Sequence, residues 1–78
     1  MHYMCLSYDL KNKPRSNYSK IYQTLGLYEH QRLQKSIWLL NTTKSSDEIM
    51  NDFRHCVDND DRFAVFPIDQ NLLNILKE

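Results

Sequence analysis

Residues 2–10 have a strand-like pattern that is apolar on both faces, and this feature constrains the fold more than any other. By the two-residue period of a strand, Tyr3, Cys5 and Ser7 share one face with Asp9. The opposite face carries apolar or aromatic residues, namely Met4, Leu6, Tyr8 and Leu10. A strand of this kind has to be covered on both faces, so the sheet needs a layer on each side.

Asp9 ends this predicted strand, just before a polar loop at residues 11–16. A carboxylate in this position is held by a rigid scaffold and is reachable from solvent, which is where folds tend to place chemistry. The alternative is that Asp9 only caps the loop, because Asp is favoured where a strand gives way to a turn.

A helix is predicted from about residue 17 to residue 25, with Ser16 or Asn17 as its N-cap. Gly26, the only glycine in the chain, stands where a helix C′ residue is expected. The apolar residues of this segment follow the spacing i, i+3, i+4 and i+7 of one helical stripe; they are Tyr18, Ile21, Tyr22 and Leu25.

A second helix is predicted from a capping box, in which Ser45 reaches forward and Glu48 reaches back. The acidic residues Asp58, Asp60 and Asp61 could suggest a calcium site, but the twelve-residue EF-hand loop with its glycine is absent. A turn that ends this helix is the better interpretation. The apolar stripe of the helix is Ile49, Met50, Phe53, Cys56 and Val57.

Residues 30–34 and 36–42 are predicted to be strands, with Trp38 and Leu40 on one face and Ile37 and Leu39 on the other. Neither Gly nor Pro lies between them, so a tight two-residue turn is not indicated, and a bend or bulge in one long ribbon is as good an interpretation. A further strand covers residues 62–66, and Asp69 is in position to cap a final short helix.

This order of elements predicts an α+β protein of the ferredoxin-like type, with an antiparallel sheet and two helices on one face. The 78 residues form a single domain, residues 1–78, with a short tail from about residue 69 to 78. The second face is covered either by the tail helix or by another copy of the chain. We favour a sheet-to-sheet homodimer with Cys5, Trp38 and Phe66 near its interface.

The charge balance argues against a protein that coats nucleic acid by bulk charge, because Lys plus Arg and Asp plus Glu both number 10. The two cysteines, Cys5 and Cys56, lack the spacing of a zinc site and are expected to be buried free thiols in a reducing compartment. No signal peptide and no membrane-spanning apolar run are present, so we expect a soluble, cytoplasmic protein without a membrane partner.

Three stretches together resemble the Cas2 family of CRISPR-associated proteins, whose relatives include the VapD-type toxins of toxin–antitoxin systems. Tyr8 and Asp9 match the YD pair that ends the first strand of that family. Arg32, Gln34 and Ser36 match its R-x-Q-x-S stretch, which continues here into an aliphatic and an aromatic residue. The hydrophobic last strand, opened by an acidic residue, is matched at residues 61–68.

The resemblance implies a ferredoxin-like homodimer in which the aspartates of both YD pairs lie near the dimer axis. It leaves two functions open: a metal-dependent endonuclease acting on RNA or DNA, or a catalytically silent module that binds nucleic acid or a protein partner. In the first, Asp9 and Ser36 are the catalytic residues, and the two Asp9 carboxylates hold Mg²⁺. Strand alternation would place Arg32, Gln34 and Ser36 on one face, with Ser36 near the Asp9 pair.

Five basic residues are candidates for contact with a phosphate backbone; they are Lys11, Lys13, Arg15, Arg32 and Lys35. His30 is the one histidine that we would test for proton transfer. The five tyrosines are predicted to serve the core and the interface rather than a base-stacking platform; they are Tyr3, Tyr8, Tyr18, Tyr22 and Tyr28.

Overall fold

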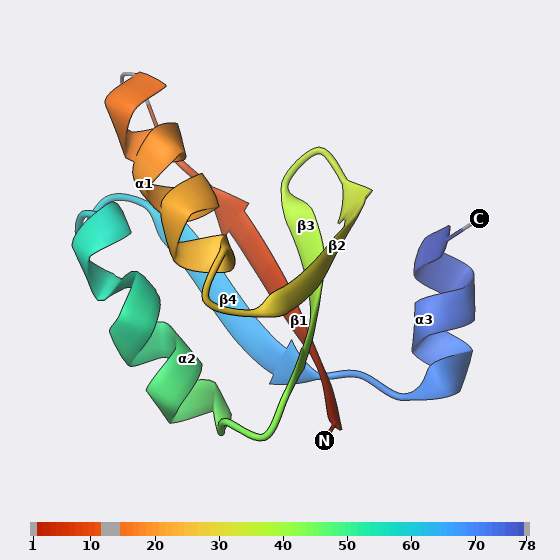
Figure 1. Cartoon of the computed structure of the whole chain (residues 1–78). Coiled ribbons are helices and arrows are strands. Elements are labelled where there is room, and N and C mark those ends of the chain that lie inside the picture. Colours follow the sequence, from red (N-terminus) through yellow and green to blue (C-terminus); the bar gives the residue numbers. More distant parts are fainter. Residues whose placement is uncertain (1, 12–14, 78) are drawn as a thin grey trace.

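The computed structural model describes residues 2–11 and 15–77, without the side chains of residues 15–17, 76 and 77 (Figure 1). The described part of the chain forms four strands, of which the second and third follow each other directly and the others are separated by helices. The elements in chain order are β1 (His2–Asp9), α1 (Arg15–Leu25), β2 (Glu29–Gln34), β3 (Ile37–Thr42), α2 (Ser46–Phe53), the short 3₁₀-helix η1 (Arg54–Cys56), β4 (Arg62–Pro67) and α3 (Gln70–Lys77).

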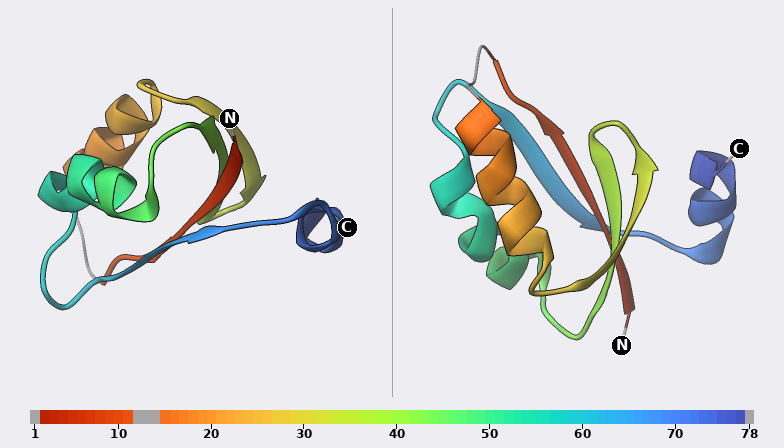
Figure 2. Two further views of the ribbon diagram at one scale, coloured as in Figure 1. Left: turned by 90° about the horizontal axis from the view of Figure 1, so that it is seen from below. Right: turned by 45° about the horizontal axis from the view of Figure 1, so that its top comes forward.

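The four strands form one sheet in the order β2-β3-β1-β4, and every neighbouring pair is antiparallel. The first strand is therefore central, as its two apolar faces require. Helices α1 and α2 lie together on one face of the sheet, and α3 lies on the other side (Figure 2). This confirms the predicted α+β class with an antiparallel sheet, and the arrangement is compatible with a ferredoxin-like fold.

The two faces of β1 enter two separate apolar clusters, as the alternation predicts. The helix face carries the larger cluster, in which Leu6, Ile21, Leu40, Ile49 and Phe53 are fully buried. The opposite face, called here the open face, carries a small cluster formed by Cys5, Leu39, Ile68 and Leu73. Both cysteines are buried free thiols, as expected.

The third helix covers the open face only in part. It contacts β2, and its Leu73 is buried against Cys5 and Leu39. Tyr3 and Phe66 remain 43% and 40% exposed on the same face. The placement of Trp38 near this face was wrong: Trp38 is paired with Leu6 of β1 and belongs to the cluster under the helices.

The β2–β3 connection corrects a second expectation. Lys35 and Ser36 form a two-residue turn without glycine or proline, and the Arg32 guanidinium donates a hydrogen bond of 2.7 Å to the Lys35 carbonyl. The expected irregularity is also present, as a register shift between Arg32 and Gln34. The shift breaks strict alternation, so Gln34 is paired with Ile37, a residue that packs on the open face. The expected one-sided set of Arg32, Gln34 and Ser36 is therefore not formed.

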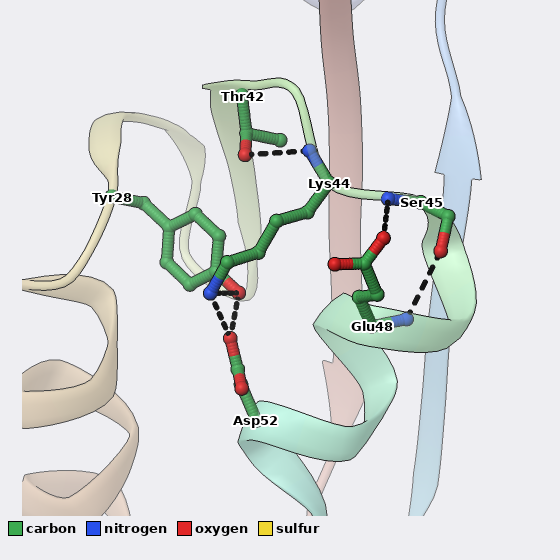
Figure 3. Close-up of polar contacts among 6 residues, drawn as sticks. All are labelled: Tyr28, Thr42, Lys44, Ser45, Glu48 and Asp52. Atoms are coloured by element: carbon green, nitrogen blue, oxygen red, sulfur yellow. Dashed lines mark hydrogen bonds and ion pairs between the residues drawn. The ribbon is translucent and has the colours of Figure 1, made fainter.

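The start of α2 follows its local signal, but α2 ends at Phe53 and is followed by η1, before the acidic run that was expected to end it; the start of α1 also departs from expectation. The Ser45 hydroxyl accepts from the Glu48 amide at 3.2 Å and the Glu48 carboxylate accepts from the Ser45 amide at 3.3 Å, which confirms the capping box (Figure 3). Helix α1 ends at Leu25, as predicted, but begins at Arg15. Ser16 and Asn17, the two expected caps, thus lie inside it, and their side chains are outside the described part. In the described part of the chain, no helix has the length and apolar character needed to cross a membrane.

Candidate functional site

Asp9 is exposed at the last position of β1. Its cross-strand partner is Arg62, the first residue of β4, and directly paired residues share a face of the sheet. The pair lies on the open face, because Cys5 and Phe66 are paired four positions earlier along β1. A hollow of about 480 Å³ adjoins Asp9 and Arg62. Sequence reasoning did not identify Arg62 as a site residue, because its position opposite Asp9 depends on the β1–β4 register.

The acidic run after α2 borders the same hollow through Asp61. The Asp61 carboxylate accepts hydrogen bonds from the backbone amides of Lys11 at 3.1 Å and Asp58 at 2.8 Å. One ligand oxygen from each of Asp58, Asp60 and Asp61 lies within 4.8 Å of the others, and all three residues make further interactions within the protein. These contacts join the turn before β4 to the chain after β1.

Ser36 does not join Asp9. Its carbonyl accepts a hydrogen bond of 3.2 Å from the Tyr8 amide, and Ser36 borders a second hollow, of about 570 Å³. Tyr8 borders both hollows. Its side chain packs under the helices, whereas Asp9, the next residue of the strand, points to the open face. The residues that line the second hollow, called here the tyrosine pocket, are Tyr8, Tyr18, Ser19, Tyr22, Arg32, Lys35 and Ser36.

Aromatic and polar contacts with Trp38 position several of the side chains that line the tyrosine pocket. The Trp38 indole N–H donates to the Tyr8 hydroxyl at 3.2 Å, and the Arg32 guanidinium carbon lies 5.1 Å from the Trp38 ring centroid. The Tyr22 ring meets Trp38 edge to face at 6.0 Å between centroids. Burial raises the pKa of Tyr8 above its ordinary value, so its hydroxyl is protonated at neutral pH.

The five candidate phosphate-binding residues are only partly brought together. Arg32 and Lys35 are exposed and line the tyrosine pocket. Lys11 is exposed near the Asp9 end of β1, where its backbone amide bonds Asp61. Lys13 lies outside the described residues, and of Arg15 only the backbone, at the start of α1, is described.

His30 belongs to neither hollow. Its Nδ1 lies 3.0 Å from the Tyr28 carbonyl oxygen, and its ring meets the edge of Trp38 at 5.7 Å between centroids. It borders a small hollow of about 180 Å³ beside Leu73 of α3. This placement keeps it away from Asp9.

Sequence reasoning missed a polar cluster formed by Tyr28, Lys44 and Asp52 (Figure 3). The Lys44 ammonium lies 2.6 Å from an Asp52 carboxylate oxygen and 4.8 Å from the Tyr28 ring centroid, and the Tyr28 hydroxyl donates to the same carboxylate. The Lys44 hydrogen bond lowers the pKa of Asp52, and the same bond raises that of Lys44. Burial, helped by the Asp52 contact, raises the pKa of Tyr28 to about 12. The cluster ties α2 to the segments that precede β2 and follow β3.

Comparisons with known proteins identify a family and a similar fold. The sequence model for the family described as CRISPR associated protein Cas2 matches residues 1–74. The crystal structure of a hypothetical protein, TT1823 from Thermus thermophilus, is similar with a TM-score of 0.66 and 17% sequence identity, over 87% of this chain and 82% of that chain. At this identity the structural similarity shows the fold alone. No curated protein sequence matches the chain.

Proposed function

Because the chain belongs to the family of CRISPR-associated protein Cas2, we propose that it acts on nucleic acid as a homodimer with an endonuclease site made by Asp9 from both copies. The observation that carries this proposal is the exposed Asp9 carboxylate on the open face, at the rigid end of the central strand. Family membership supports the nucleic-acid substrate, and the position of Asp9 supports the paired site.

The open face supports the homodimer. Tyr3 and Phe66 are 43% and 40% exposed beside the buried Cys5 and Leu39. Such an apolar area is expected to be covered, and a second copy of the same face covers both areas at once. Asp9 belongs to this face at the end of β1, so a two-fold axis that passes near this end would bring the two Asp9 residues together.

The residues at this position fit a magnesium ion. Asp9 is exposed and supplies hard carboxylate oxygens, and Mg²⁺ is commonly held by one or two carboxylates while it retains several waters. Asp9 of each copy would hold the ion, which, when bound, supplies a Lewis acid and an activated water. Arg62, opposite Asp9, carries the guanidinium that would orient the scissile phosphate by charge-assisted hydrogen bonds.

The test is cleavage of end-labelled RNA and DNA with Mg²⁺ or Mn²⁺, comparing the unmodified protein with Asp9→Asn and Arg62→Gln. We expect Asp9→Asn to fall to the background seen with a chelator, and Arg62→Gln to lose at least about tenfold. Asp47→Asn, at an exposed position in the first turn of α2, is the matched control and should cleave normally. Equal cleavage by Asp9→Asn would overturn the assignment.

A catalytically silent binding module is the second candidate. It is favoured by the single carboxylate that β1 supplies from each copy, and by the tyrosine pocket, whose described lining holds Arg32 and Lys35 without an acidic residue. Anisotropy with the same labelled strands separates the candidates. A silent module binds them equally well in the unmodified protein and in Asp9→Asn, and cleaves them in neither.

A further inference from the structure

We propose that the tyrosine pocket binds one phosphorylated nucleotide, with the phosphate against Tyr8, Arg32 and Lys35 and the base against Tyr22. This inference rests on the proposal that the protein acts on nucleic acid, and it names a ligand site separate from Asp9. The chemistry is that of a nucleoside monophosphate unit, supplied either as a free nucleotide or as the phosphorylated end of a strand.

The size and lining of the pocket select the ligand class. Its volume of about 570 Å³ falls in the range of roughly 300–1,000 Å³ typical of small-molecule sites. The described lining residues include two cations, Arg32 and Lys35, and no carboxylate. The remaining lining residues all carry hydroxyl groups, and they are Tyr8, Tyr18, Ser19, Tyr22 and Ser36. Cations and hydroxyl donors without a competing carboxylate favour an oxyanion.

The Tyr8 hydroxyl is the most specific feature of the pocket. The Tyr8 side chain is only 5% exposed, yet it borders the hollow. Its oxygen accepts from the Trp38 indole N–H at 3.2 Å, which leaves the hydroxyl proton to donate elsewhere. Among the described residues no acceptor for that proton is seen. A phosphate oxygen in the pocket would accept it.

Arg32 is positioned in advance for the same phosphate. One of its terminal nitrogens donates to the Lys35 carbonyl at 2.7 Å, and its guanidinium packs over Trp38 at 5.1 Å from the ring centroid. A guanidinium has five N–H donors in a fixed fork, so several remain for a phosphate. Because the side chain is already ordered, binding costs less conformational entropy than it would for a mobile arginine. Lys35 adds a second positive charge at the rim.

Tyr22 provides the surface for a base. It is 46% exposed, although it lies on the helix side of the protein. Among the described residues, its ring contacts one aromatic ring, that of Trp38, in a T-shaped arrangement. Stacking on tyrosine accepts any base, because every base has a π-face. The expectation that all five tyrosines serve the core or the interface thus gives way, for Tyr22, to a ligand role.

The shape of the pocket favours a single nucleotide over a continuous duplex. It is a hollow bounded by residues of α1 and of the β2–β3 turn, so one unit can enter, whereas duplex phosphates run along a convex surface. Tyr8 and Asp9 are consecutive in β1 and point to opposite faces. Nucleotide binding and Asp9-dependent cleavage can therefore be lost independently.

The experiment measures how tightly the intact protein binds three kinds of ligand. They are a nucleoside 5′-monophosphate, inorganic phosphate, and a short single strand that carries a 5′-phosphate, a 3′-phosphate or neither. The variants are Tyr22→Ala, Arg32→Gln and Tyr8→Phe, which removes only a hydroxyl, with far-ultraviolet circular dichroism confirming that each is folded. We expect each variant to weaken nucleotide binding by about tenfold. Arg54→Gln, at an exposed position of η1 outside the pocket, is the charge-matched control and should change binding by less than about twofold.

The ligands distinguish the sources. If a terminally phosphorylated strand binds at least about tenfold more tightly than the unphosphorylated strand, the natural ligand is a strand end. If a mononucleotide binds as tightly as the phosphorylated strand, the natural ligand is a free nucleotide. The proposal is overturned if inorganic phosphate binds as well as the nucleotide, if no probe binds, or if the three variants bind like the control. Asp9→Asn should bind the nucleotide as the unmodified protein does. Failure of the nucleotide-binding test therefore does not decide the cleavage test, and failure of the cleavage test does not decide nucleotide binding.

Discussion

The two faces of the sheet differ sharply in how they are covered, although the central strand is apolar on both. On the helix face, α1 and α2 enclose a continuous cluster that includes the fully buried Leu6 and Phe53. On the open face, α3 buries Leu73 against Cys5 but leaves Phe66 40% exposed. The difference indicates that the helix face carries most of the stability of one chain, whereas the open face is available for assembly.

The largest expected effect comes from removing a phenylalanine ring from each face in turn. Phe53→Ala should lower the free energy of unfolding by about 3–5 kcal/mol, because it leaves a cavity in the buried cluster. Phe66→Ala should cost less than about 1.5 kcal/mol in dilute, monomeric protein, because much of the ring is already in water. Urea unfolding followed by circular dichroism measures both. Equal losses would abolish the distinction between the faces.

The next effect concerns association. Phe66→Asp places a charge in the proposed interface and should weaken the dimer by at least about 2 kcal/mol, since buried aromatic anchors dominate interfaces. Light scattering across a dilution series measures the dissociation constant. Leu27→Asp is the control, because Leu27 is 71% exposed in the turn after α1 and should leave the dimer intact. A dimer unaffected by Phe66→Asp would place the interface elsewhere.

A smaller effect tests how far the helix face depends on the start of α2. Ser45→Ala removes the hydroxyl that accepts from the Glu48 amide, and should lower the free energy of unfolding by about 1 kcal/mol. Thr43→Ala, an exposed position two residues earlier, should change it by less than about 0.5 kcal/mol. Thermal unfolding of the two variants gives the comparison. A larger loss for Thr43→Ala would show that the loop, rather than the cap, orders α2.

The sequence predicted the features that depend on local spacing. The two faces of β1, the capping box at Ser45 and the end of α1 before Gly26 follow from the periods of strand and helix and from single-residue preferences. The glycine-free turn at Lys35 and Ser36 was missed because a side chain stabilises it: the Arg32 guanidinium bonds the Lys35 carbonyl.

The parts of the site that were not predicted depend on register and on distant pairs. Alternation placed Trp38 and Leu40 on one face, but only the pairing of Trp38 with Leu6 decides that this face lies under the helices. The separation of Ser36 from Asp9 has the same origin. Lys44 follows Tyr28 by 16 residues and Asp52 follows it by 24 residues. No local motif predicts a contact over such separations.

The smallest effect is the pH dependence of that cluster, which belongs to the helix face alone. The pKa of Asp52 lies below its ordinary value of 3.8, because Lys44 and Tyr28 donate hydrogen bonds to its carboxylate. The folded state therefore binds the Asp52 proton less tightly than the unfolded state does, so this stabilisation is present above the ordinary pKa and is lost as the pH falls through the folded value.

Tyr28 acts in the opposite direction: its pKa is raised from 10.0 to about 12, so its contribution is present below pH 10.0 and is lost as the pH rises toward 12. Melting temperatures measured across pH for the unmodified protein and for Asp52→Asn should differ at neutral pH and converge in acid. The control variant Asp47→Asn should show no such convergence. If the difference in melting temperature between the unmodified protein and Asp52→Asn stays constant into acid, the Asp52 charge does not stabilise this side of the sheet.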